Sequence, residues 1–259
     1  MAAVAAGAQN NRLLAASSKN VIVTDLISKK VLHRYTGHEG RVNDVALLND
    51  DLYVSASYDG TVRLWDGRDR SKYTPLQTLR EAKDSVTKVS VPRRLHQRDN
   101  SPRLCTASVD GTVRVYDIRK GVLVCFDLGN PVIGLDVSSD EPLIAASCLD
   151  GTVRLLDTSD SSGGIDNQQN TQSCLLKTYS GTHVAGQYAL DCALTDRYVW
   201  TGSEDGSCVA YDVLTTKPIQ TLAGNDRSKP VCAIAVRPKD SVVVTCSYNG
   251  EGLVWTPRG

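Results

Sequence analysis

The sequence of 259 residues has few of the side chains that fill helical or aromatic cores. It contains one Phe, one Met and three Trp, and no stretch shows a sustained helical period of apolar residues. A core of Val, Leu and Ala favours packed strands over a helical bundle. The formal net charge is zero, which argues against a general affinity for nucleic acid or for an anionic membrane surface.

Cysteine is also too sparse to hold the fold together. The eight cysteines are too few for a disulfide scaffold, and no two have the short spacing of a zinc knuckle. We therefore expect buried free thiols, no metal site and a reducing compartment, cytoplasmic and nuclear. The Ala-rich opening Met1 to Ala8 lacks the basic leader and long apolar core of a signal peptide, and no transmembrane run is present.

The sequence lacks the common enzyme motifs. There is no phosphate-binding Gly-Lys-Ser/Thr loop, no Gly-x-Ser-x-Gly elbow and no His-Glu-x-x-His, and the four histidines are dispersed. Catalytic chemistry normally requires a recognisable nucleophile, base or metal cluster, so a non-enzymatic protein without a cofactor is favoured. A catalytic group assembled from distant residues is the less favoured alternative.

What the sequence does contain is a repeat. Each copy holds an Asp-Gly pair, which suits a two-residue turn between two antiparallel strands. After the turn, Val62 and Leu64 alternate with Arg63 and Trp65, which places the two sets on opposite faces of a strand. The three strongest copies are Asp59 to Asp66, Asp110 to Asp117 and Asp150 to Asp157.

Weaker copies extend the pattern over the whole chain. The units are about 40 to 55 residues apart, and a four-stranded propeller blade takes about 40 to 45. The sequence predicts one all-β domain, residues 1–259, folded as a β-propeller with six recognisable blades. The six units end near Asp25, Asp66, Asp117, Asp157, Asp212 and Thr256.

One unit carries a fuller motif. The pair Gly37-His38, the run from Ser55 to Asp59 and the closing Trp65-Asp66 resemble the WD-repeat family. That resemblance implies a propeller, most often of seven blades, and a hydrogen-bonded tetrad inside a blade. Here the tetrad would be His38, Ser55, Asp59 and Trp65.

Other units depart from this motif. The units that hold Tyr116 and Trp255 lack the histidine, and His183 lies one residue late in Gly181-Thr182-His183. We expect these units to depend more on apolar packing. The last unit ends on a third strand at Trp255, so we count 23 candidate strands, one fewer than six complete blades need. The ring is therefore expected to close incompletely.

Protein-binding residues are expected on the face that carries the short turns. Exposed Tyr and Arg are enriched at interaction hot spots, whereas a scattered surface with no site is an equally open alternative. The candidates on this face are Arg41, Tyr58, Tyr188, Glu204 and Tyr248.

Two groups of arginines suggest other partners. Arg68 and Arg119 follow Trp65-Asp66 and Tyr116-Asp117, and they resemble the adaptor box of WD-repeat substrate receptors for a cullin-RING ubiquitin ligase. Bonding of these arginines to neighbouring carbonyls or carboxylates beside the strand end is the favoured alternative. A basic insert could bind RNA or another anion, but without aromatic residues for stacking a solvated loop is favoured. Its arginines include Arg93, Arg94 and Arg98.

Stretches outside the repeat motif give a narrower resemblance. Leu76 to Ala82, Ser147 to Asp150 and Tyr188 to Cys192 resemble the mitogen-activated protein kinase organizer proteins, a WD-repeat scaffold family also linked to spliceosomes. The resemblance implies a non-catalytic scaffold for kinase-cascade or spliceosomal proteins, with no small-molecule substrate and no membrane contact. A ubiquitin-ligase substrate receptor and an RNA-processing factor that contacts RNA directly are the alternatives.

Overall fold

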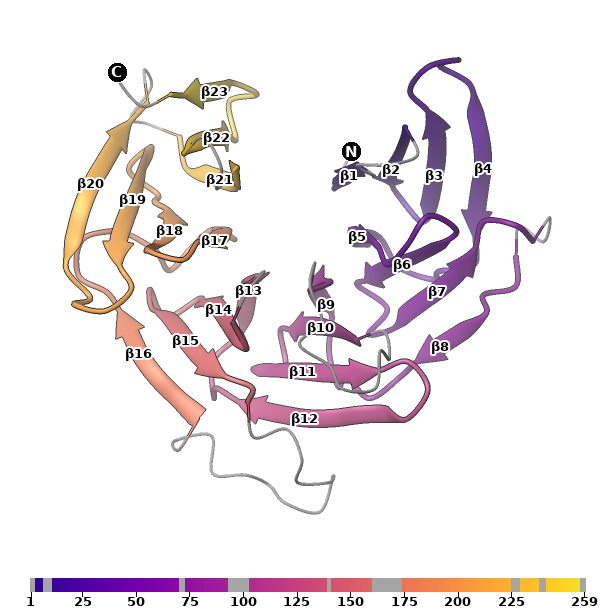
Figure 1. Ribbon diagram of the computed structural model, residues 1–259, viewed down its shortest axis with the longest axis horizontal. Helices are drawn as coiled ribbons and strands as arrows, with labels where there is room; N and C mark the ends of the chain where they lie inside the picture. The colour runs from indigo at the N-terminus through magenta and orange to yellow at the C-terminus, as the bar shows by residue number, and fades with distance from the viewer. Residues whose placement is uncertain are drawn as a thin grey trace.

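The computed structural model describes residues 3–6, 11–69, 73–92, 103–138, 141–159, 174–224, 229–237 and 241–256. Within these ranges the chain forms 23 strands in six antiparallel sheets. The sheets are arranged around a common centre, with the first strand of each innermost (Figure 1). This confirms the predicted all-β propeller, and we name its sheets blade 1 to blade 6 in chain order. No helix in the described part of the chain could cross a membrane.

Blades 1 to 3 have four strands each, and consecutive strands pair antiparallel. Blade 1 holds β1 (Val4–Ala6), β2 (Arg12–Ser17), β3 (Asn20–Asp25) and β4 (Val31–Thr36). Blade 2 holds β5 (Val42–Leu47), β6 (Leu52–Ser57), β7 (Val62–Asp66) and β8 (Gln77–Leu79). Blade 3 holds β9 (Val86–Ser90), β10 (Arg103–Ser108), β11 (Thr112–Asp117) and β12 (Gly121–Asp127).

Blades 4 and 5 repeat this order, and blade 6 stops one strand short in the described residues. Blade 4 holds β13 (Val132–Val137), β14 (Leu143–Cys148), β15 (Val153–Asp157) and β16 (Leu175–Tyr179). Blade 5 holds β17 (Cys192–Leu194), β18 (Tyr198–Gly202), β19 (Ser207–Asp212) and β20 (Pro218–Ala223). Blade 6 holds β21 (Val231–Arg237), β22 (Val242–Ser247) and β23 (Gly252–Trp255).

The turn between the second and third strands has the same backbone conformation in blades 2 to 6. Its glycine adopts a positive φ, from 75° at Gly60 to 87° at Gly250. A side chain with a Cβ atom rarely adopts this conformation, so each turn depends on its Asp-Gly or Asn-Gly pair. The predicted hairpins are therefore present where the repeats placed them.

The core lies between blades, because both faces of a blade are apolar. Leu14 and Val23 of blade 1 pack in one buried cluster with Tyr53 and Trp65 of blade 2. Each fully buried side chain of this size stabilises the fold by about 1.5–3 kcal/mol. Blades therefore stabilise one another in sequence around the ring.

The ring is open between blade 6 and blade 1 (Figure 1). Blade 6 packs on blade 5 through β21, while its other face has no neighbouring blade among the described residues. Cys125 and Cys246 are exposed, contrary to the expectation that the cysteines are buried. Cys125 lies on the outer strand β12, and Cys246 lies on the face of blade 6 that no blade covers. Incomplete closure and the count of 23 strands in the described residues agree with the sequence prediction.

Candidate protein-binding surfaces

The structure brings together all four residues of the predicted tetrad in blade 2. His38 Nδ1 lies 2.8 Å from Asp59 Oδ2, and His38 Nε2 lies 2.8 Å from Ser55 Oγ. Trp65 Nε1 donates to the same Ser55 Oγ at 2.9 Å. Each bond contributes a net of about 0.5–1.5 kcal/mol, so the tetrad ties the short turn of the blade to its second and third strands.

The protonation states of His38 and Asp59 favour the hydrogen bond between them. Burial lowers the pKa of His38 below its usual range, although Asp59 opposes the shift. Burial also disfavours the charged form of Asp59, but hydrogen bonds from Thr61 and His38 outweigh it and hold the pKa of that carboxyl well below its usual range. At neutral pH the network therefore pairs a neutral imidazole with a carboxylate.

Blades without the histidine hold their turns differently. In blade 3, Arg114 bonds Asp110 at 3.0 Å, and in blade 4 Arg154 bonds Asp150 at 2.7 Å. In these two blades an arginine four residues after the turn Asp thus binds the turn carboxylate that His38 binds in blade 2. The sequence Asp-Gly-Thr-Val-Arg carries this signal in blades 3 and 4, but the prediction of apolar packing missed it.

The remaining partial tetrads are in blades 5 and 6. His183 is buried, and its Nδ1 lies 2.8 Å from the Tyr211 hydroxyl instead of a turn carboxylate. In blade 6, Trp255 Nε1 donates to Thr245 Oγ1 at 2.9 Å, which is the tetrad bond between the second and third strands. The one-residue offset of His183 therefore redirects the ring to the tyrosine of the third strand.

On the face with the short turns, two candidate residues from separate blades form a pair. The rings of Tyr188 and Tyr248 are 5.5 Å apart, and the two residues are 43% and 53% exposed. Burial raises the pKa of Tyr248, and the positive charge of Arg41 on the same face opposes this shift. We call Arg41, Tyr188 and Tyr248 the tyrosine rim.

The two other candidates on this face have distinct positions. Glu204 is half-buried, and its Oε1 accepts the N–H groups of Gln187 and Tyr188 at 2.6 and 2.9 Å. Glu204 therefore positions Tyr188 and has less capacity left for a partner. Tyr58 is 67% exposed, and its N–H donates to the carbonyl of Arg41 at 2.8 Å.

The inner strands carry charges that the sequence interpretation did not single out. Lys88 Nζ lies 2.8 Å from Asp191 Oδ2, which ties blade 3 to blade 5. Asp44 of blade 2 accepts the N–H of Val89 at 3.0 Å, and burial raises its pKa to about 6 although Lys88 opposes the shift. Residues 103 positions apart meet here, and no local pattern announces such a pair.

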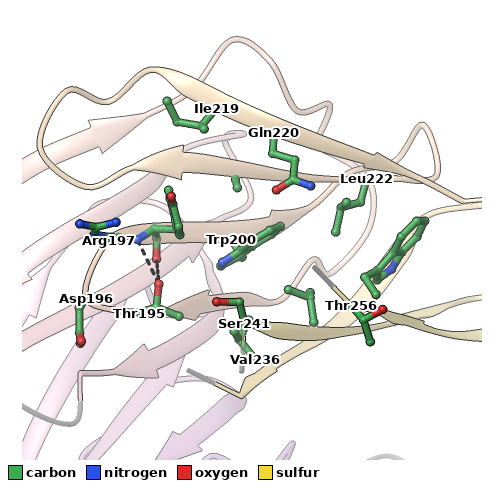
Figure 2. Close-up of a pocket in the computed structure, with 14 residues that line it drawn as sticks. Thr195, Asp196, Arg197, Trp200, Ile219, Gln220, Leu222, Val236, Ser241 and Thr256 are labelled. Atoms are coloured by element: carbon green, nitrogen blue, oxygen red, sulfur yellow. Dashed lines mark hydrogen bonds between the residues drawn. The ribbon is translucent and has the colours of Figure 1, made fainter. Parts of the chain in front are cut away.

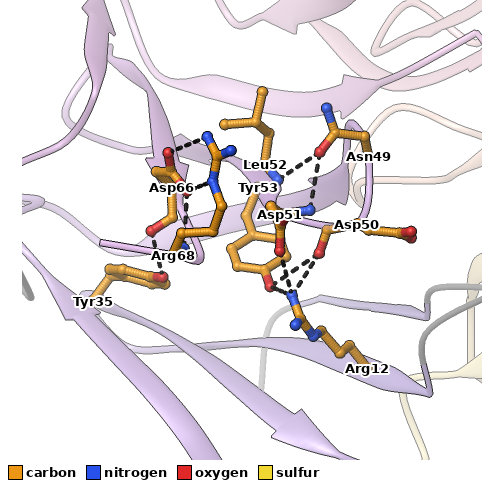
Figure 3. Close-up of polar contacts among 9 residues, drawn as sticks. All are labelled: Arg12, Tyr35, Asn49, Asp50, Asp51, Leu52, Tyr53, Asp66 and Arg68. Atoms are coloured by element: carbon orange, nitrogen blue, oxygen red, sulfur yellow. Dashed lines mark hydrogen bonds and ion pairs between the residues drawn. The ribbon is translucent and has the colours of Figure 1, made fainter. Parts of the chain in front are cut away.

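The suggested adaptor-box arginine in blade 2 is bonded within its own segment. Arg68 donates through Nε and Nη2 to the two carboxylate oxygens of Asp66 at 3.0 and 2.8 Å (Figure 3). These bonds lower the pKa of Asp66 to about 2. Arg119 is exposed, and its backbone N–H donates to Asp117 Oδ1 at 2.8 Å. The geometry at Arg68 is the local carboxylate bond that the sequence offered as the alternative.

A second contact in this region joins neighbouring blades. Arg12 of blade 1 donates to the Tyr53 hydroxyl at 2.6 Å and to the carbonyl of Asp50 at the same distance (Figure 3). The proposed anion patch of Arg93, Arg94 and Arg98 lies outside the described residues.

A groove of about 670 Å³ lies between blade 5 and blade 6, beside the strands through which they pack. Trp200, Leu222 and Trp255 line its apolar part, and Arg197 and Asp196 lie at its polar end (Figure 2). Trp200 is only 6% exposed, so it is a core residue, and its ring faces this groove.

The chain is similar to several individual proteins and also matches a protein-family model. The chain is 28% identical over 270 residues to the WD repeat domain-containing protein 83 homolog of Dictyostelium discoideum, covering 95% of this chain and 78% of that protein. It is 33% identical over 186 residues to WD repeat domain-containing protein 83 of Rattus norvegicus, covering 71% of this chain and 51% of that protein. Autophagy-related protein 16 of Arabidopsis thaliana is 25% identical over 249 residues, covering 94% of this chain and 45% of that protein.

The chain therefore spans most of the Dictyostelium protein but only about half of the other two. The family model described as WD domain, G-beta repeat matches residues 29–66, 73–117, 124–157 and 216–256. These matches cover more than half of the chain and end at the third strands of blades 2, 3, 4 and 6. With the tetrad of blade 2 and the ring of sheets, they show that the chain belongs to the WD-repeat family.

Proposed function

We propose that the chain is a non-catalytic scaffold that binds protein partners through its tyrosine rim. The observation that carries this proposal is the contact between two exposed tyrosine rings from different blades. Tyrosine and arginine supply large contact areas with a polar tip, which makes them frequent hot-spot residues. The rigid ring adds effective concentration, because partners held on one disc meet without new chemistry.

The partners would be kinase-cascade or spliceosomal proteins, and the protein would work in the cytoplasm and nucleus. The resemblance of Leu76 to Ala82, Ser147 to Asp150 and Tyr188 to Cys192 to the kinase organizer family supports this proposal. No small-molecule substrate or membrane contact is part of it.

The test is affinity purification with quantitative mass spectrometry on three forms of the full chain. The wild type should recover mainly kinases or mainly splicing proteins, which separates the two branches. The double variant Tyr188→Ala, Tyr248→Ala should recover the same proteins about tenfold less, which corresponds to about 1.4 kcal/mol.

Tyr73→Ala is the matched control, because Tyr73 is 74% exposed and lies away from the tyrosine rim in the sequence. It should leave recovery unchanged. Equal recovery by the wild type and the double variant would contradict the role of the rim.

A further inference from the structure

The last strand of blade 6 has an edge that pairs with no other strand in the described residues. In β23 the carbonyl of Glu251 accepts the N–H of Ser247, so residues 251, 253 and 255 face β22. Backbone groups alternate along an antiparallel strand, so Gly252 and Val254 point their N–H and C=O at the open edge. Such an edge is a template for another strand.

The other five blades show what kind of strand fits this position. In each of these blades, the fourth strand places one large apolar side chain opposite a residue near the start of the third strand. Tyr35, Leu79, Phe126 and Tyr179 are at most 5% exposed. The five pairs are Val21↔Tyr35, Val62↔Leu79, Val113↔Phe126, Val153↔Tyr179 and Cys208↔Leu222. The corresponding third-strand residue of blade 6 is Gly252.

The face around Gly252 is apolar and uncovered. Val254 is 66% exposed, and it pairs with Val244, which pairs in turn with Ala235. Cys246 pairs with Gly252 in the next row. In blade 5 the matching face, with Cys208 and Ala210, packs on blade 6. The outer face of blade 6 is therefore an apolar surface of the kind that a neighbouring blade covers elsewhere in the ring.

The groove between blades 5 and 6 adjoins the same edge. In complete blades the third-strand aromatic residue is covered by the preceding fourth strand. The ring centroids of Tyr35 and Trp65 are 5.1 Å apart, those of Tyr179 and Tyr211 are 5.7 Å apart, and Leu79 packs in one buried cluster with Tyr116. At Trp255 the preceding strand supplies Leu222, yet the space beside it remains open. A strand added to β23 alternates its side chains between this groove and the open face.

We propose that β23 binds an extended strand of a partner protein, antiparallel to β23, with a Leu, Phe or Tyr side chain opposite Gly252. This is β-augmentation, in which backbone bonds give affinity and side-chain pockets give specificity. A second copy of the chain fits less well. Its Leu253 and Trp255 already face blade 5, so a self-paired β23 would offer only glycine and valine to the site. The proposal concerns a surface separate from the tyrosine rim.

The probe is a fluorescent peptide with the sequence of β4, Val31 to Thr36, which carries Tyr35 at the required position. It should bind the purified full chain in fluorescence anisotropy, and a Tyr35→Ser peptide should bind about tenfold more weakly. N-methylation at Tyr35 should have a similar effect, because that amide faces the third strand in blade 1. N-methylation at Arg34 should have little effect, because that amide points away. These amide directions follow from the N–H of Asp25, which donates to the carbonyl of Lys30 and therefore faces β4. Every second residue of β3 faces the same way, so Val21 exchanges backbone bonds with its partner Tyr35.

Two protein variants complete the test. Val254→Pro removes an edge N–H without touching the bonds to β22, and it should abolish peptide binding. Val254→Thr keeps that N–H and should bind like the wild type. The four peptides decide the question even if Val254→Pro fails to fold.

Several results would overturn the proposal. They are no binding of the Tyr35 peptide, equal binding of the two N-methyl peptides, and a stable dimer whose contact protects Gly252 and Val254 from hydrogen exchange. Loss of the tyrosine rim leaves these measurements unchanged, so the two proposals fail separately.

Discussion

Blade 2 and blade 6 follow the same repeat but differ in how completely they are held. Blade 2 has four strands, neighbours on both faces and a tetrad in which Ser55 and Trp65 are at most 1% exposed. Blade 6 has three described strands, one neighbour and a single tetrad bond, from Trp255 to Thr245. We therefore expect the same substitution to cost more in blade 2 than in blade 6.

The largest expected effect comes from removing the tryptophan of each blade. Trp65→Ala should lower the free energy of unfolding by about 3–5 kcal/mol, because it leaves a cavity in a closed interface. Trp255→Ala should cost less than half as much, since Trp255 borders an open groove and is already partly exposed. Urea denaturation of the two variants measures the difference, and equal losses would contradict the comparison.

A smaller difference is expected for the hydroxyl groups that accept the indole N–H. Ser55 Oγ bonds both His38 and Trp65, so Ser55→Ala leaves two buried groups without a partner. It should cost about 1–3 kcal/mol in the free energy of unfolding. Thr245→Val removes one bond and should cost about 0.5–1.5 kcal/mol. A larger loss for Thr245→Val in thermal denaturation would show that blade 6 is the better-held blade.

The two blades should also differ in their response to pH. The pKa of Asp44 in folded blade 2 is about 6, above its usual 3.8, so the folded state binds more protons between these values. Its contribution to stability is present below pH 3.8 and is lost as pH rises through 6. Asp44→Asn should therefore be more stable than the wild type at pH 8, and this advantage should vanish at pH 4.

Ala233→Ser is the control for that experiment, because Ala233 holds the matching position in blade 6 and adds no titrating group. Its stability difference from the wild type should not change between pH 4 and pH 8. A difference between wild type and Asp44→Asn that is constant with pH would show that Asp44 has an ordinary pKa.

The smallest effect is expected at the ends of the third strands. Arg68 bonds Asp66, but the side chain is 70% exposed, and blade 6 ends at Thr256 with no such pair. Because exposed ion pairs contribute little, Arg68→Glu should leave the unfolding midpoint unchanged. The same variant, combined with Arg119→Glu, tests the ligase-receptor alternative in a pulldown of the ligase adaptor. We expect no loss of adaptor recovery that depends on these charges.

The sequence predicted most of the architecture because the repeat is local. Asp-Gly turns and alternating residues such as Val62 and Arg63 define hairpins wherever they occur, and the strand count followed from them. The tetrad of blade 2 was also accessible, because the matching motif is complete there. The same patterns indicated that the last blade would end on its third strand.

The contacts between blades could not be predicted in the same way. The pair of Lys88 and Asp191 depends on the curvature of the ring, which no local pattern encodes. Tyr188 and Tyr248 were expected on one face, but the distance between their rings follows from how blades 5 and 6 pack. The groove beside Trp255 follows from how blades 5 and 6 pack, so Trp200, which is only 6% exposed, also lines a surface feature.

Residue-resolved hydrogen exchange of the purified chain measures whether the outer edge of β23 is unpaired. The amides of Gly252 and Val254 face the open edge, whereas those of Val62 and Leu64, at matching positions of blade 2, face β8. We expect fast exchange for the first pair and slow exchange for the second. Protection of Gly252 and Val254 equal to that of Val62 and Leu64 would show that the outer edge of β23 is already paired and that blade 6 is as complete as blade 2.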